Sequence, residues 1–143
     1  MLNRLFLAAV SLALVGCTQT RPLALDDIAR DSERTLAAIS AMEHRIVHEG
    51  LTDDEQNQAL KNASMYRQSV IAMDKVIDEI ATTPMSPDFT DRFESQLRTW
   101  HRHLQTRLEQ PAQVFAEAEF DQEAFDQWLA QVESTRESAE GLR

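Results

Sequence analysis

The chain has little glycine, little proline and a single cysteine: 3, 4 and 1 among 143 residues. Glycine and proline interrupt helices, so their scarcity favours long helices. One cysteine cannot form a disulfide within the chain, so the fold depends on its apolar core. The sequence also lacks a glycine-rich phosphate loop, a Gly-x-Ser-x-Gly motif and a Glu-x-x-His motif of di-iron bundles. These absences argue against an enzyme and against a bound cofactor.

Basic residues are also scarce, 14 against 24 acidic ones, which gives a formal net charge of −10. A strongly acidic chain is repelled by nucleic acid and by anionic lipid headgroups. We therefore expect no nucleic-acid partner. We also expect that any attachment to a membrane does not depend on basic residues.

One apolar run stands near the N-terminus. Met1 to Arg4 carries one positive charge, and the residues from Leu5 to Val15 are apolar apart from Ser11. The run is shorter than the roughly 20 residues that a membrane-spanning helix needs, and it has the length of a signal peptide. It ends in Leu14-Val15-Gly16-Cys17, where a small glycine precedes the only cysteine.

This four-residue segment resembles the lipobox of bacterial lipoprotein precursors. The resemblance implies that the Cys17 thiol receives a diacylglyceryl group, that residues 1–16 are cleaved off, and that the new N-terminus is acylated, for example by palmitate. Buried acyl chains contribute about 0.8 kcal/mol per CH₂, and two or more chains give stable anchoring. The alternative is that Cys17 is an ordinary apolar residue and that a general signal peptidase cleaves the leader elsewhere.

The residue after the cysteine is Thr18. In lipoproteins an Asp at this position commonly retains the protein in the inner membrane, so the resemblance implies an outer-membrane lipoprotein that faces the periplasm. Cleavage removes Arg4, which leaves 13 basic residues against 24 acidic ones and a charge of −11. Residues 17–24 are expected to form the lipidated N-terminus and a short linker, and residues 25–140 one helical domain that lies close to the bilayer.

Apolar residues recur at steps of three and four in four stretches, which predicts four amphipathic helices. The first is predicted to run from Leu25 to His48. The second follows a capping box formed by Thr52 and Glu55. The third begins at Ser86-Pro87, and Pro111 ends it.

The last stretch is predicted to be kinked or split, because Asp121 can cap a fresh start. Residues after Glu133 have little apolar content and are expected to fray. Four helices with short connections predict an all-α fold, an antiparallel up-down four-helix bundle. The alternative is a longer two-helix hairpin that packs against a partner or against a second copy.

Two histidine pairs are the only candidate metal ligands. His44 and His48 are four residues apart and share a helix face, as metal ligands can. They lie away from the apolar stripe, and exposed pairs are more often solvated than liganding, so we expect no metal there. His101 and His103 are two residues apart on a helix and cannot readily share an ion.

The C-terminal part is rich in large aromatic and acidic residues. Its aromatic residues are core candidates and, alternatively, a docking face for a partner protein: Phe115, Phe120, Phe125 and Trp128. The segment 109–143 holds nine acidic residues and two arginines, whereas four arginines lie in the third helical stretch: Arg92, Arg98, Arg102 and Arg107. We expect the last two helices to be neighbours whose charges pair across their contact, each pair contributing little.

The segment Leu51-Thr52-Asp53-Asp54-Glu55-Gln56 is similar to the Leu-Thr-x-x-Gln motif of periplasmic stress chaperones of the Spy and CpxP type, with the Gln displaced by one residue. The capping box accounts for the same residues. We predict a lipid-anchored, non-enzymatic envelope protein that binds another protein as an accessory or assembly factor of an envelope or secretion complex. The alternatives are a stress- or metal-responsive chaperone-like protein and an immunity protein.

Overall fold

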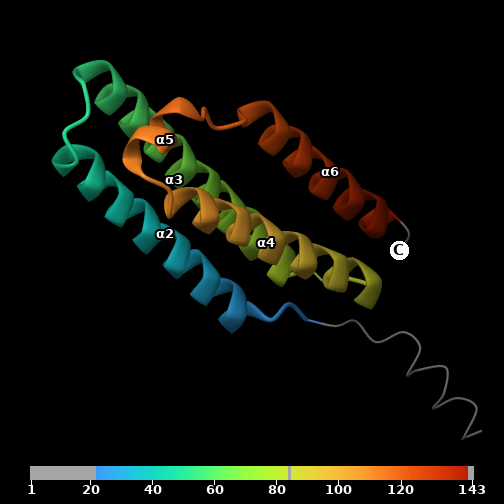
Figure 1. Cartoon of the computed structure of the whole chain (residues 1–143). Helices are drawn as coiled ribbons and strands as arrows, with labels where there is room; N and C mark the ends of the chain where they lie inside the picture. Colours follow the sequence, from blue (N-terminus) through green and yellow to red (C-terminus); the bar gives the residue numbers. More distant parts are fainter. Residues whose placement is uncertain (1–21, 84, 142–143) are drawn as a thin grey trace, which may run out of the picture.

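The computed structural model describes residues 22–83 and 85–141, and these form five helices that pack against one another (Figure 1). The helices are α2 (Leu25–His48), α3 (Asp53–Ala81), α4 (Pro87–Leu108), α5 (Ala112–Glu117) and α6 (Gln122–Gly141). No strand occurs in these two ranges, so the predicted all-α class is confirmed for them. The predicted signal peptide and the segment that resembles a lipobox, with Cys17, lie outside the described residues. None of the described helices is long and apolar enough to cross a bilayer.

Local signals set the first helix boundaries. The predicted bounds of the first helix are those observed for α2. Gly50 follows in a left-handed conformation (φ 72°), which glycine adopts without steric penalty. The capping box is confirmed: Thr52 Oγ1 accepts a hydrogen bond from the Glu55 N–H at 3.2 Å, and the Glu55 carboxylate accepts from the Thr52 N–H at 3.0 Å.

The predicted split of the last helical stretch is also confirmed. Asp121 Oδ1 accepts a hydrogen bond from the Ala124 N–H at 2.9 Å, so Asp121 caps α6 and separates it from α5. The predicted fraying after Glu133 is wrong, because α6 continues to Gly141. Arg136 pairs with Glu79 on α3 at 2.9 Å, which holds this part of α6 against α3, and with Glu133 of its own helix at 2.8 Å.

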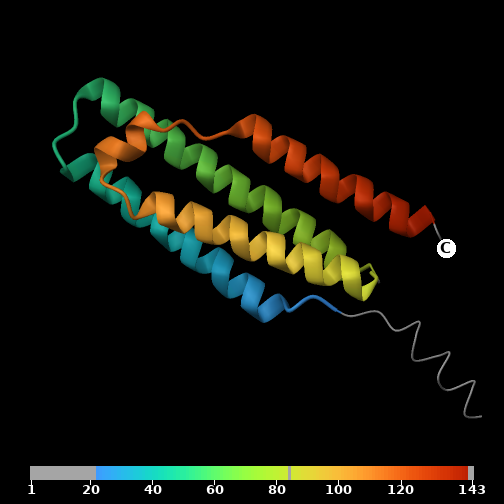
Figure 2. The ribbon, with the colours of Figure 1, turned by 45° about the vertical axis from the view of Figure 1, so that its right-hand side comes forward.

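Contacts between α2 and α4 show that these helices are parallel. The Ala24 N–H, just before α2, donates to Glu94 Oε1 at 2.8 Å, and the Arg45 guanidinium donates to the Gln110 carbonyl at 2.9 Å beyond the end of α4. In contrast, α2 and α3 are antiparallel, as the Ser32–Asp74 hydrogen bond shows together with the contact between Arg67 and Glu43. Figures 1 and 2 show the same alternation of directions along the chain.

The apolar stripes of the helices form one core. On α3, the apolar residues at steps of three and four that predict this helix are buried from Ala63 onward: Ala63, Tyr66, Val70, Met73, Ile77 and Ile80. On α2 and α4 the stripe is shifted by one position in places, because Thr35 and His101 are buried while their neighbours Leu36 and Trp100 are only half-buried. Two polar residues therefore occupy core positions, and Trp100 lies at the edge of the core.

Candidate partner-binding groove

Aromatic rings join α4 to α6, two helices that run in opposite directions in Figures 1 and 2. The ring centroids of Trp100 and Trp128 are 6.1 Å apart and their planes differ by 5°. The Phe93 and Trp128 rings are 6.4 Å apart with planes 9° apart, and Trp100 and Phe125 are 5.2 Å apart. Such large rings hold the two helix backbones apart, and ring pairs of this kind stabilise a contact beyond the area they bury.

A groove of about 390 Å³ opens beside these rings, and we call it the aromatic groove. Its lining comes from one face of α4 and from one residue of α6: Ser95, Gln96, Thr99, Trp100, His103 and Trp128. An adjoining hollow of about 100 Å³ shares Gln96 with it and is lined further along the two helices by Phe89, Arg92, Phe93, Gln131 and Val132. The contact between α4 and α6 is thus hollowed along much of its length.

The aromatic groove combines indole rings with uncharged polar groups. Among the described residues, no carboxylate lines it. The Trp100 indole Nε1 is buried and has no hydrogen-bond partner among the described residues. A buried N–H without an acceptor costs free energy, so the groove wall holds an unsatisfied donor. A volume in this range and an apolar lining with a few polar groups are typical of ligand and partner sites.

The predicted charge pairing across α4 and α6 is not observed. Within residues 22–83 and 85–141, no ion pair joins an arginine of α4 to an acidic residue of α6. The α6 arginine, Arg136, instead pairs with Glu79 on α3. On α4, Arg92 donates through Nε to the Asp88 carbonyl at 3.3 Å, and Arg102 is exposed. Arg92 therefore gives the α4 side of the hollowed contact a basic lining residue, with the acidic Asp88 and Asp91 next to it on the same helix.

The four aromatic candidates of the C-terminal part divide between core and groove. Phe115, Phe120 and Phe125 are 1%, 8% and 2% exposed and belong to the core. Tyr66 on α3 holds two of them, with ring centroids 5.3 Å from Phe115 and 5.0 Å from Phe120. Burial raises the pKa of the Tyr66 hydroxyl. Trp128 alone is half-buried and lines the aromatic groove.

A buried polar cluster between α2 and α4 was not predicted. Thr35 Oγ1 donates to the Asp31 carbonyl at 2.9 Å, so this oxygen accepts from His101 Nδ1 at 2.9 Å and from Gln105 Nε2 at 3.2 Å. This arrangement assigns the ring proton of the neutral histidine to Nδ1. His101 Nε2 is buried and has no partner in the described part of the chain.

Burial lowers the pKa of the His101 imidazole, and the carboxylates of Asp31 and Asp74 partly oppose this effect. The spacing of His101 from its apolar neighbours indicates a core position. His101 follows Leu97 by four residues and precedes Leu104 by three, as a core residue of a bundle helix does. Because the cluster is enclosed between helices, its role is in stability.

The predicted metal candidates lie together on α2. The rings of His44 and His48 are exposed, with centroids 4.3 Å apart and planes 56° apart. No group of three or more His, Cys, Asp or Glu side chains that could hold a metal ion occurs among the residues described. The pair therefore offers two imidazole ligands without a third from the described part of the chain.

No protein family model, curated protein or solved structure matches this chain.

Proposed function

We propose that this chain is a lipid-anchored, non-enzymatic protein of the cell envelope that binds another protein through the aromatic groove, as an accessory or assembly factor. The lipobox at Leu14–Cys17 supports the anchor and, with Thr18, an outer membrane facing the periplasm. The observation that carries the binding function is the groove itself. Partly exposed tryptophans beside a hollow are typical of residues that dominate protein interfaces.

For the domain we propose an up-down bundle of the four long helices α2, α3, α4 and α6. The parallel contacts of α2 with α4 and the antiparallel contacts of α2 with α3 support this arrangement. The short α5 is an addition to it. Asn62 of α3 donates to the carbonyls of Phe115 and Ala118, so α5 is held against α3.

The groove lining does not favour catalysis. Ser95 and His103 both line it, but they are eight residues apart on α4, about 12 Å along the helix axis. A serine nucleophile needs its base within hydrogen-bond distance. The lining is better suited to holding an apolar side chain of a partner than to activating a nucleophile.

The anchor is tested by metabolic labelling with an alkyne analogue of palmitate. The unmodified chain should take up the label and partition with the membrane fraction, and Cys17→Ser should abolish both, since no other cysteine is present. A Cys17→Ser chain that still carries the label would contradict the proposed anchor.

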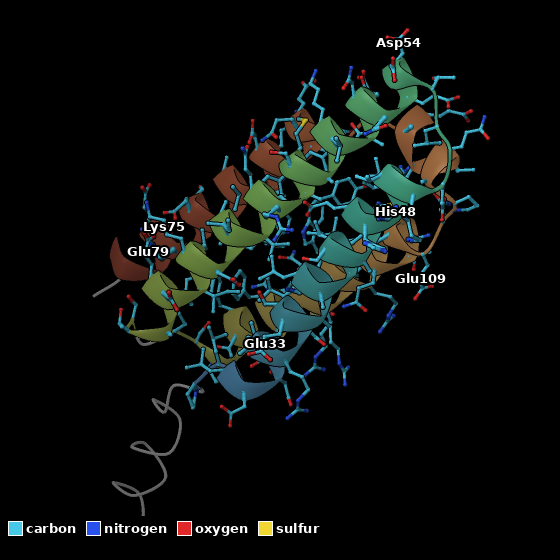
Figure 3. All side chains as sticks on the ribbon, turned by 90° about the vertical axis from the view of Figure 1, so that its left-hand side faces the viewer. Glu33, His48, Asp54, Lys75, Glu79 and Glu109 are labelled. Atoms are coloured by element: carbon cyan, nitrogen blue, oxygen red, sulfur yellow. The ribbon has the colours of Figure 1, made fainter. Side chains whose placement is uncertain are left out.

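Partner binding is tested by photo-crosslinking in intact envelopes. A photoreactive phenylalanine analogue in place of Thr99 lies in the groove, whereas the same analogue in place of Lys75 lies on the outer side of α3 (Figure 3). We expect a discrete crosslinked protein from the Thr99 position, weakened by Trp128→Ala, and none from the Lys75 position. Equal products from both positions, or no product from Thr99, would refute binding through the groove.

The His44–His48 pair supports a second candidate, a metal-responsive chaperone-like protein. Two imidazoles one helical turn apart can bind Zn²⁺ or Cu²⁺ with water as the remaining ligands. This candidate predicts that Cu²⁺ raises the midpoint of thermal unfolding, and that His48→Ala abolishes the rise while His103→Ala leaves it. An unchanged midpoint on adding Cu²⁺ would remove this candidate.

A further inference from the structure

We propose that the partner segment in the aromatic groove is an amphipathic helix whose apolar stripe is bordered by acidic residues on the edge that faces α4. This inference rests on the proposed function and specifies the chemistry of its partner. Two observations carry it, the elongated shape of the hollowed contact and the charges along its border.

The shape fits a helix rather than a compact ligand. The aromatic groove and the adjoining hollow extend along α4 from Phe89 to His103, 14 residues or about 21 Å along the axis. The two hollows share the lining residue Gln96 and so adjoin one another along α4, and we call them together the track. A helix places apolar side chains at steps of three and four, which would fill successive hollows of such a track. A small ligand would occupy only one of them.

The border of the track has opposite character on its two sides. On α4, Arg92 is the charged residue that lines the adjoining hollow. Arg102 follows the groove residue Thr99 by one turn, and Asp91 precedes the groove residue Ser95 by one turn, but neither lines a hollow. Neither guanidinium has a carboxylate partner in residues 22–83 or 85–141. On α6, the lining residues are uncharged: Trp128, Gln131 and Val132.

Charge complementarity therefore favours carboxylates on the partner edge next to α4. Charges at the rim of an interface contribute little affinity each, but they select the partner and fix its orientation. An overall acidic chain would ordinarily repel an acidic partner, so a preference for one depends on this local basic border.

The groove has a built-in reporter. The chain contains 2 tryptophans, Trp100 and Trp128, and both line the aromatic groove. Intrinsic tryptophan emission of the chain from residue 17, with Cys17→Ser for work in solution, therefore reads this site alone. The probes are two peptides of roughly 18 residues, about five helical turns, without Trp or Tyr. Both carry the same leucine stripe; one has glutamates along the stripe edge and the other has lysines.

We expect the glutamate peptide to shift the emission and to bind roughly fivefold more tightly than the lysine peptide at low salt, with a smaller difference at high salt. The double substitution Arg92→Glu and Arg102→Glu should reverse the preference. Lys61→Glu with Lys75→Glu changes the net charge equally but on exposed positions of α3, and it should leave the preference unchanged. Figure 3 shows Lys75 on the outside of α3.

Three outcomes would overturn the inference: no emission change with either peptide, equal or tighter binding of the lysine peptide, or loss of the preference in the α3 double variant as well. If these occur while the Thr99 crosslink persists, the groove binds a protein of other chemistry and the proposed function stands. If the peptide preference holds but envelopes give no crosslink at Thr99, the proposed function is refuted instead.

Discussion

His101 is the most enclosed titratable side chain between α2 and α4. It is 2% exposed, one ring nitrogen is hydrogen-bonded to Thr35, and the other has no partner among the described residues. Protonation would place a positive charge in the core, where only the more distant Asp31 and Asp74 carboxylates favour it. The folded protein therefore keeps this histidine neutral more strongly than the unfolded chain does.

This difference predicts a loss of stability in mild acid. An unfolded histidine has a pKa of about 6.5, whereas burial lowers the pKa of folded His101. As the pH falls below about 6.5, the unfolded chain binds a proton that the folded state does not, and the free energy of unfolding falls by up to about 1.4 kcal/mol per pH unit. Urea unfolding between about pH 7.5 and about pH 5 measures this slope.

The matched variants are His101→Gln and His103→Gln. His101→Gln removes the buried titrating group and should flatten the pH dependence, although it lowers stability at neutral pH. His103→Gln changes an exposed histidine and should keep the slope of the unmodified chain. The same slope in all three proteins would mean that other groups cause the acid sensitivity.

At the scale of single residues, the sequence could not decide which of two adjacent positions enters the core. Trp100 follows Leu97 by three residues and His101 follows it by four, and both steps fit a helical stripe. The larger apolar residue was the natural choice from composition. The structure buries His101 because Thr35 and Gln105 provide hydrogen bonds, and these contacts between distant residues cannot be read from local spacing.

Among the elements, α5 is tied to α3 by the buried side chain of Asn62 as well as by the contact of Tyr66 with Phe115. Asn62 is 1% exposed, and its Nδ2 donates to the Phe115 carbonyl at 3.0 Å and to the Ala118 carbonyl at 3.2 Å. α5 has six residues, too few to be stable without tertiary contacts. The amide of Asn62 thus fixes the turn by which the chain passes from α4 to α6.

Replacing this amide should destabilise the fold. Asn62→Ala leaves two enclosed carbonyl oxygens without their donor and should lower the free energy of unfolding by about 2 kcal/mol in urea titrations. Gln113→Ala, on an exposed position of α5, should change it by less than about 0.5 kcal/mol. Equal effects of the two substitutions would show that the Asn62 hydrogen bonds do not hold α5.

Helix ends were predictable from the sequence where the residues that fix them are close together in the chain. The capping box at Thr52 and the cap at Asp121 involve partners three residues away, so the sequence is sufficient to find them. The extension of α6 to Gly141 was not predictable, because Arg136 is held by Glu79, 57 residues earlier. The aromatic groove was not predictable for the same reason, since it depends on how far the rings of α4 and α6 keep these helices apart.

For the whole molecule, the hollowed contact between α4 and α6 predicts that α6 opens locally more readily than the helices of the common core. α6 meets α4 through a few aromatic rings beside open space, whereas the stripes of α2 and α3 are buried in the common core. Helices with fewer enclosed apolar contacts open more readily than the core. We expect amides of α6 to exchange with deuterium roughly tenfold faster than central amides of α3.

Hydrogen-exchange mass spectrometry measures this difference directly. Trp128→Ala should speed exchange further in α6 and leave the centre of α2 unchanged, because Trp128 contacts α4 and other residues of α6. Exchange of all helices in a single cooperative step, with identical rates in α6 and α3, would contradict an unevenly stable molecule.

The hydrogen bond from the Ala24 N–H to Glu94 Oε1 has a mechanical consequence. A force applied to the chain ahead of Pro22 reaches α4 through this bond as well as α2 through the backbone. Because α2 and α4 are parallel, the force pulls both helices along their axes. To yield, both helices must slide past the helices packed against them, whereas a single helix could detach turn by turn. The fold is in this way attached to whatever precedes it by two helices instead of one.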